Sequence, residues 1–288
     1  MRRHRFLEFF PSPNLAACRQ PPFITRRYPW RDKRRMLEAI GPDLAAEFRW
    51  QESEAAQQPV GEMAEIFNST ENVFKSQHYL PIYESALSRV RTRPIKMLEI
   101  GVDRGGSLQM WRRYLHPESV IVGIDINPAA SQYDNRAQDI HVRIGSQQDI
   151  AFLQNLISEF GAFDVILDDG SHMTSHMVKT FRWLFPNGLA SGGVYIVEDI
   201  GTNYQKSWRD DPMTFVDFTK WLIDAMHARC QGRKNLRQIF ANLEDPSHLQ
   251  DYDVFVATTI LEKIEFYESI ALFHRADGHR EMPRSVWR

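Results

Sequence analysis

The feature that most constrains the fold of this chain is a series of short apolar segments separated by stretches with helical spacing of apolar residues. Each segment is rich in Val, Ile and Leu and ends at glycine or acidic residues, as buried parallel strands commonly do. The expected strands are residues 96–100, 120–125, 140–144, 163–167 and 193–197. Strands that alternate with helices in this way predict an α/β fold with a doubly wound, mostly parallel, Rossmann-like sheet.

The end of the chain has a different pattern. Residues 263–267 and 270–273 are two further strand-like segments, and only Glu268 and Ser269 separate them. So short a connection joins antiparallel neighbours, because parallel strands need a longer crossover. We therefore expect a C-terminal antiparallel strand pair.

The amino-terminal residues differ in composition from the rest. We divide the chain into an irregular, partly helical, Arg- and Pro-rich extension over residues 1–60 and one domain over residues 61–288, which begins with a helical cap over residues 61–94. An Arg-rich start is typical of organellar transit peptides, but this one has almost no serine and contains several prolines. We interpret it as an arm lying on the acidic body or on a neighbouring subunit, which would suit a homo-oligomer.

The overall charge limits the classes of partner. The chain has 35 Lys and Arg against 37 Asp and Glu, a net charge of −2 at pH 7. This balance argues against a nucleic acid or a membrane surface as partner, and there is no apolar stretch long enough for a membrane span or a secretory signal. Cys18 and Cys230 lie far apart without metal-ligand spacing, so we expect free thiols in a reducing compartment and a cytoplasmic protein.

Two of the expected strands end in acidic residues. Residues 163–167 run into Asp168-Asp169-Gly170-Ser171-His172, and residues 194–197 run into Glu198-Asp199. The carboxyl ends of parallel strands share one edge of the sheet, where open α/β sheets bind their ligands. Such an edge can hold a hard divalent cation through oxygen ligands, with a titratable imidazole beside it. The alternative is that these carboxylates only cap the following helices.

The turn after the first strand contains several glycines. It reads Glu99-Ile100-Gly101-Val102-Asp103-Arg104-Gly105-Gly106-Ser107, and glycines let a backbone approach a bound ligand closely. A dinucleotide fingerprint would need glycine where Asp103 stands, and a carboxylate is unfavourable beside a pyrophosphate. A ligand with an ammonium or sulfonium group suits this turn better. Asp125, at the end of the second strand, can accept both hydroxyls of a ribose.

These motifs together resemble a known family. They are Leu98-Glu99-Ile100-Gly101, Gly123-Ile124-Asp125, Asp168-Asp169-Gly170-Ser171-His172 and Gly192-Gly193-Val194-Tyr195-Ile196-Val197-Glu198-Asp199. The chain resembles class I S-adenosylmethionine-dependent methyltransferases, and in particular the metal-dependent sugar O-methyltransferases of macrolide biosynthesis, of the mycinamicin and tylosin type. The resemblance covers residues 67–275 and implies that Asp169, Glu198 and Asp199 bind Mg²⁺ and that His172 is the general base.

The resemblance also implies a site for S-adenosyl-L-methionine. We expect the cofactor to contact one set of residues around the first four strands, which comprises Glu99, Gly101, Gly105, Ser107, Asp125, Gln147 and Asp168. His78 and Tyr79 can fold over it from the cap. The family commonly has Gly-Asp-Gln where this chain has Gly145-Ser146-Gln147, so the adenine contact differs in detail. Tyr204 and Trp208 can line an acceptor pocket, because flat apolar surfaces suit sugar rings and macrocycles.

The leading hypothesis is therefore an S-adenosylmethionine- and Mg²⁺-dependent O-methyltransferase that acts on a sugar hydroxyl of a glycosylated, macrolide-like natural product. One alternative is a catechol- or phenol-type O-methyltransferase with a similar metal edge. Another is an NAD(P)-dependent reductase, which Asp103 and the lack of an obvious Tyr-x-x-x-Lys pair disfavour. A third is a non-catalytic nucleoside-binding or scaffold protein.

Overall fold

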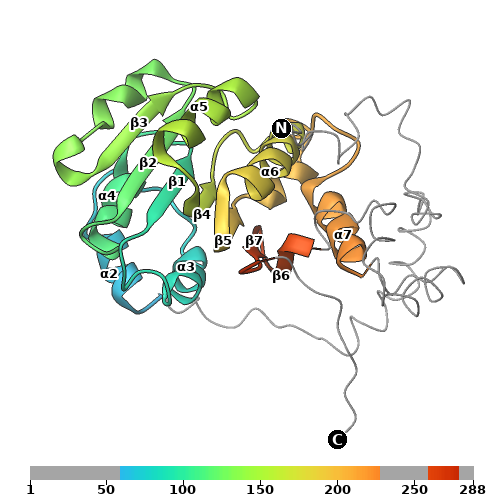
Figure 1. Cartoon of the computed structure of the whole chain (residues 1–288), viewed down its shortest axis with the longest axis horizontal. Helices are drawn as coiled ribbons and strands as arrows, with labels where there is room; N and C mark the ends of the chain where they lie inside the picture. The colour runs from blue at the N-terminus through green and yellow to red at the C-terminus, as the bar shows by residue number, and fades with distance from the viewer. Residues whose placement is uncertain (1–58, 228–258, 279–288) are drawn as a thin grey trace, which may run out of the picture. The chain divides into compact units, whose positions relative to one another are not determined.

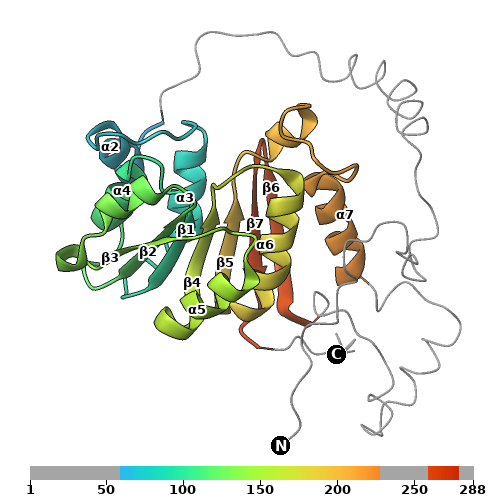
Figure 2. The ribbon, with the colours of Figure 1, turned by 90° about the horizontal axis from the view of Figure 1, so that it is seen from above.

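The computed structural model describes residues 59–227 and 259–278, which form a sheet with helices on both faces (Figures 1 and 2). The expected extension, apart from its last two residues, and a polar segment over residues 232–250 lie outside the described residues. The helices are α2 (Glu62–Asn68), α3 (Tyr79–Leu87), α4 (Gly106–Tyr114), α5 (Ile150–Phe160), α6 (Thr174–Asn187) and α7 (Phe215–Met226). The strands are β1 (Lys96–Ile100), β2 (Val120–Asp125), β3 (Ile140–Ile144), β4 (Phe163–Asp168), β5 (Leu189–Val197), β6 (Leu261–Tyr267) and β7 (Ile270–Arg275). Short 3₁₀ turns complete the described elements: η2 (Pro128–Tyr133), η3 (Arg136–Gln138) and η4 (Ile200–Tyr204).

The strands form one seven-stranded sheet in the order β3-β2-β1-β4-β5-β7-β6. Strands β1 to β5 are parallel, whereas β7 pairs antiparallel with both β5 and β6. The predicted doubly wound sheet and its C-terminal antiparallel pair are therefore confirmed. The order reverses between β1 and β4, and the crevice at such a reversal is where α/β sheets bind ligands.

The sheet separates two hydrophobic cores because neighbouring side chains of a strand point to opposite faces. In β1, Leu98 and Ile100 pack with helices α5, α6 and α7, whereas Met97 packs with α2, α3 and α4 on the other face. The same alternation in β5 sends Tyr195 to the first core and Ile196 to the second. Figure 2 shows the two helical layers. Both faces are covered, which explains why the strand sequences are nearly continuous in apolar residues.

Two prolines lie near helix ends. Helix α7 begins at Phe215, shortly after Pro212, and Pro186 lies in the last turn of α6. No helix in the described ranges is long and apolar enough to cross a membrane. The boundary between residues 60 and 61 stays a prediction.

Candidate active site

The glycine turn brings the end of β1 against the segment that follows β4. Gly101 has φ +95°, and its amide donates to the carbonyl of Ile124 at 2.8 Å. A β-carbon on Gly101 would lie 2.2 Å from the carbonyl oxygen of Asp169. Gly105, the N-cap of α4, also has a left-handed conformation, with φ +72°. Glycine is therefore required at position 101 by both backbone conformation and space.

Asp125 is held at the carboxyl end of β2 by backbone amides. Its Oδ2 accepts from Val102 at 2.9 Å and from Asp103 at 3.0 Å, and its Oδ1 accepts from Asn127 at 2.8 Å. These bonds fix the carboxylate beside the glycine turn. The remaining acceptor positions of the two oxygens can serve the hydroxyls of a ribose.

A cavity of about 340 Å³ opens over these strand ends. Of the expected cofactor residues, Tyr79, Gly101, Ser107 and Asp125 line it. Of the expected metal and catalytic residues, Asp169, His172, Glu198 and Asp199 line it as well. The structure thus brings the expected metal and catalytic residues to one cavity, together with part of the expected cofactor set.

Asp168 and Gln147 occupy a different place from that expected for cofactor contacts. Asp168 is 1% exposed, lies beneath the strand ends and accepts hydrogen bonds from Gln147 (3.2 Å) and Tyr195 (3.2 Å). Gln147 is buried too, and its Oε1 accepts from the amide of Ser171 at 3.0 Å. Burial raises the pKa of Asp168 to about 7, although hydrogen bonds from Tyr195 and Gln147 oppose the shift. Neither side chain lines the cavity, and both support the segment that carries His172.

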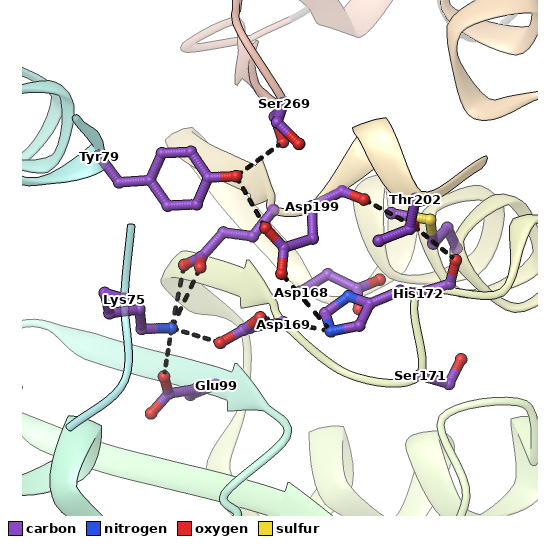
Figure 3. A network of polar contacts seen from close by, with 12 residues as sticks. Lys75, Tyr79, Glu99, Asp168, Asp169, Ser171, His172, Asp199, Thr202 and Ser269 are labelled. Carbon is purple, nitrogen blue, oxygen red and sulfur yellow. Dashed lines mark hydrogen bonds and ion pairs between the residues drawn. The ribbon is translucent and has the colours of Figure 1, made fainter. Parts of the chain in front are cut away.

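Asp169, His172 and Asp199 gather at the edge where β4 and β5 end (Figure 3). One ligand atom from each residue lies within 4.8 Å of the other two. Nε2 of His172 is 3.8 Å from Oδ1 of Asp169 and 3.8 Å from Oδ2 of Asp199. The Nδ1 atom of His172 is buried and has no hydrogen-bond partner among the described residues. The imidazole therefore presents Nε2 to the two carboxylates.

The backbone at this edge is held in an uncommon conformation. His172 has φ +56° and Asp199 has φ +54°, and neither is glycine. The carbonyl of His172 accepts from Asn203 at 3.1 Å and from Thr202 at 3.3 Å, both in η4, just after Asp199. These bonds join the turn after β4 to the turn after β5. Left-handed residues of this kind need such support, and they concentrate at functional sites.

A buried lysine lies in the middle of the acidic residues. Nζ of Lys75 is 2.5 Å from Asp169 Oδ2, 3.1 Å from Glu198 Oε1 and 3.4 Å from Glu99 Oε1. Figure 3 shows dashed lines from the Lys75 ammonium to carboxylates at the ends of different strands. Burial would lower the pKa of Lys75, but the charges of these three residues raise it well above its ordinary value. Lys75 therefore remains an ammonium ion.

The carboxylate of Glu198 contacts Lys75 and Tyr83. Its Oε1 accepts a short hydrogen bond from the hydroxyl of Tyr83, and both of its oxygens accept from Lys75. Burial and the charge of Asp169 raise the pKa of Glu198 to about 8. Glu99 is the third carboxylate that contacts the Lys75 ammonium, and it also accepts a hydrogen bond from the hydroxyl of Ser107 at 2.8 Å. Glu99 thus lies under the cavity.

The donor set fits a hard divalent cation. Asp169 and Asp199 offer carboxylate oxygens, the ligand type that Mg²⁺ and Ca²⁺ prefer. One ammonium faces three carboxyl groups, and Asp199 adds a fourth, so acidic groups outnumber the ammonium at this edge even when Glu198 is neutral. A dication would balance this excess. Oε1 of Glu198 already accepts from Tyr83 and Lys75, whereas Oε2 accepts from Lys75 alone and so keeps an acceptor position for an ion.

The cap closes the cavity from the side of α3. The hydroxyl of Tyr79 donates to Asp199 at 2.8 Å and lies 3.2 Å from the carbonyl of Ser269. Nε2 of His78 lies 2.9 Å from the carbonyl of Glu268. Both residues therefore bind the turn between β6 and β7, and Tyr79 also fixes Asp199. His78 does not line the cavity.

Neither of the two expected acceptor residues lines the cavity. Tyr204 is 63% exposed and Trp208 is 36% exposed. The Trp208 ring meets the His172 ring edge-on, with centroids 5.8 Å apart. The structure thus places an exposed aromatic surface next to His172.

Sequence reasoning missed the roles of Lys75 and Tyr83. Both lie in the segment Lys75-Ser76-Gln77-His78-Tyr79-Leu80-Pro81-Ile82-Tyr83, which carries part of the resemblance. The available signal was one lysine four residues before the start of α3. Nothing in that local pattern indicates contacts with carboxylates 24, 94 and 123 residues away.

Comparison with known proteins identifies the fold and its relatives. Residues 98–200 match a family model described as a methyltransferase domain. The chain is 36% identical over 162 residues to the 8-demethyl-8-(2-methoxy-alpha-L-rhamnosyl)-tetracenomycin-C 3'-O-methyltransferase of Streptomyces olivaceus, covering 52% of this chain and 40% of that protein. It is 34% identical over 161 residues to the mycinamicin VI 2''-O-methyltransferase of Micromonospora griseorubida, covering 51% of this chain and 39% of that protein. The chain thus spans about two fifths of the length of these relatives.

Solved structures give the same picture. The MycE methyltransferase from the mycinamycin biosynthetic pathway, in complex with Mg and SAH, has a TM-score of 0.62 at 26% identity, covering 76% of this chain and 55% of that one. A complex of the same enzyme with Mg, SAH and mycinamycin VI has a TM-score of 0.61 at 26% identity, covering 85% and 62% of the two chains. These matches confirm the resemblance to class I methyltransferases of this type.

Proposed function

We propose that this chain is an S-adenosylmethionine- and Mg²⁺-dependent O-methyltransferase that acts on a sugar hydroxyl of a glycosylated natural product. The observation that carries the proposal is the gathering of Asp169, His172 and Asp199 at the edge of the cavity that Asp125 and the glycine turn also line. The relatives supply the reaction class, since they are named as O-methyltransferases of rhamnosyl tetracenomycin and mycinamicin.

The cofactor half of the proposal rests on the strand ends β1 and β2. Gly101 lets the backbone approach the ligand, and Asp125 offers carboxylate oxygens to the ribose hydroxyls. The acidic surroundings suit the positive charges of the sulfonium and the ammonium group of S-adenosylmethionine. Gln147 and Asp168 would support this site from below, because both are buried.

The acceptor half rests on His172 and its neighbours. Methyl transfer to an alcohol needs alignment of the two reactants and removal of the hydroxyl proton. His172 Nε2 is the expected proton acceptor, and Trp208 and Tyr204 offer flat surfaces to the sugar and the aglycone. Asp169 and Asp199, with Glu198, would hold Mg²⁺, which supplies charge stabilisation that makes a bound hydroxyl more acidic.

The test is methyl transfer from labelled S-adenosylmethionine to a panel of rhamnosylated and macrolide glycosides, with catechols as competing substrates, in Mg²⁺ or in EDTA. We expect transfer to glycosides that stops in EDTA and returns with Mg²⁺. Transfer that persists in EDTA would remove the metal from the proposal. Preferred transfer to catechols would support the phenol-type alternative. A protein that binds NADP(H) but does not bind S-adenosylhomocysteine would support the reductase alternative.

The His172→Ala variant separates a general base from a metal ligand. We expect its kcat to fall by roughly 10²–10⁴-fold, the usual worth of general-base catalysis, while the Mg²⁺ affinity measured by calorimetry stays close to that of the unmodified protein. The control is His141→Gln, because His141 lies in β3 away from the cavity. An unchanged kcat would remove His172 as the base, and loss of Mg²⁺ binding would make it a ligand.

The homo-oligomer and the lack of a nucleic-acid partner stay predictions. Light scattering of the full chain would measure the first, and a binding titration with DNA and RNA the second.

A further inference from the structure

The ammonium group of Lys75 is fully occupied by contacts with carboxylates. Its side chain is 1% exposed, and its three ammonium hydrogens face three carboxylates, from Glu99, Asp169 and Glu198. The closest contact, at 2.5 Å, is with Asp169. An ammonium group in this position has no donor left for a cofactor or a substrate.

Lys75 shares its carboxylates with the candidate metal site. Asp169 directs Oδ2 to Lys75 and Oδ1 toward His172, so the same carboxylate belongs to both groups of residues. Both oxygens of Glu198 lie within 3.3 Å of Nζ of Lys75. A dication bound to Oδ1 of Asp169 would therefore lie close to the ammonium group of Lys75, which contacts Oδ2 of the same carboxylate. Two cations so close repel each other strongly in a buried environment.

We propose that Lys75 is a resident counter-cation, which keeps Asp169 and Glu198 together while the metal is absent and competes with the metal for their oxygens. The inference rests on the proposed function, since it presupposes that Mg²⁺ binds at this edge. Lys75 is a positioning residue here, not a catalytic one. Its charge weakens metal binding and stabilises the site when no metal is bound.

The Lys75→Met variant tests both effects of the charge. Without metal, its melting temperature is expected to fall by about 8 °C or more, because buried carboxylates lose their only buried cationic partner in the described structure. Its Mg²⁺ affinity, measured by calorimetry, is expected to tighten by about tenfold or more, because the competing charge is gone. Saturating Mg²⁺ should therefore raise its melting temperature by more than that of the unmodified protein.

The matched control is Lys179→Met, which removes an exposed lysine of α6 with the same change in net charge. It should change neither quantity. Lys75→Arg retains the positive charge, so its Mg²⁺ affinity should stay weak. A purely structural role for Lys75 predicts the opposite sign for Met, namely weaker Mg²⁺ binding from a disordered site.

A measurement on the unmodified protein covers the case in which Lys75→Met does not fold. In protein labelled with ¹⁵N at lysine Nζ, the Lys75 signal should shift on saturation with Mg²⁺, whereas the Lys179 signal should not. An unmoved Lys75 signal in protein that binds Mg²⁺ overturns the inference. So does weaker Mg²⁺ binding by folded Lys75→Met.

The outcome separates this inference from the proposed function. If neither the unmodified protein nor Lys75→Met binds Mg²⁺, the metal site itself is refuted, and the inference falls with it. If the unmodified protein binds Mg²⁺ and Lys75→Met weakens that binding, only the inference fails. If Lys75→Met instead lowers the affinity for S-adenosylhomocysteine in EDTA by tenfold or more, while Lys179→Met does not, Lys75 is a cofactor ligand and the counter-cation role is refuted.

Discussion

Gly101→Ala is the substitution whose effect follows most directly from the structure. The new methyl group would lie 2.2 Å from the carbonyl oxygen of Asp169, 2.9 Å from its carbonyl carbon and 3.2 Å from Cα of Gly170. All of these are backbone atoms, so no side-chain rotation can relieve the clash. The residue would also keep φ near +95°, which L-residues rarely adopt.

The magnitude has two parts. A left-handed conformation costs an alanine about 1–2 kcal/mol, and forced expansion of a packed contact costs about 1–3 kcal/mol more. We expect Gly101→Ala to lower the free energy of unfolding by about 2–5 kcal/mol in total. Because the displaced atoms belong to Asp169, the affinity for Mg²⁺ should fall as well.

Gly192→Ala is the control that isolates the conformational part. Gly192 has φ +72°, but a β-carbon there would have its nearest neighbour at 3.5 Å, Oδ1 of Asp277. We expect a loss of only about 1–2 kcal/mol, from the backbone conformation alone. The assay is urea-induced unfolding of both variants without metal, followed by Mg²⁺ titration. Equal losses for the two variants would refute the close approach between the glycine turn and Asp169.

Two other substitutions test the support of the site and the charge of the sheet edge. Asn203→Ala removes a buried bridge between the carbonyl of His172 (3.1 Å) and the amide of Phe215 (2.9 Å), so it should cost about 2–4 kcal/mol in urea unfolding and lower kcat. Unchanged stability and kcat would show that other contacts hold the His172 backbone. At the sheet edge, burial alone would raise the pKa of Glu265, but hydrogen bonds lower it from 4.5 to about 2; the donors are Lys263, Tyr267 and His274. The depressed pKa means that ionised Glu265 stabilises the fold above pH 4.5 and that this stabilisation is lost as the pH falls toward 2. The deficit of Glu265→Gln in unfolding free energy should therefore shrink as the pH is lowered from 6 to 3.5, and a deficit independent of pH would contradict this.

Much of the sheet could be predicted because burial on both faces leaves a clear mark in the sequence. Strands β2 and β4 are nearly continuous apolar runs, which are typical of a sheet covered on both sides. The turn of Glu268 and Ser269 was short enough to require an antiparallel pair. Local sequence patterns were sufficient to predict an element when its neighbours in space are close in sequence, or when its burial produces a run of apolar residues.

The site was only partly predictable. Asp168 and Asp169 are adjacent carboxylates, and the local pattern does not say which one enters the cavity; only the resemblance indicated Asp169. The pairing of Asp168 with Val197 at the last position of β4 decides it, because this register buries Asp168 and directs Asp169 toward Lys75. Lys75 itself could not be assigned, since its partners come from three separate strand ends.

The turn between β6 and β7 carries a consequence for how this protein is made. The carbonyl of Ser269 accepts from Ile200 at 3.0 Å, its hydroxyl oxygen accepts from Gly201 at 3.0 Å, and Tyr79 reaches the same turn. The rim around Asp199 is thus built from segments nearly two hundred positions apart, the last of which leaves the ribosome late. A nascent chain can assemble its nucleoside-facing strands early, but it cannot fix its acidic rim until this hairpin arrives. A chain that ended before β6 would lack the contacts of Ser269 with Ile200, Gly201 and Tyr79 that support this rim.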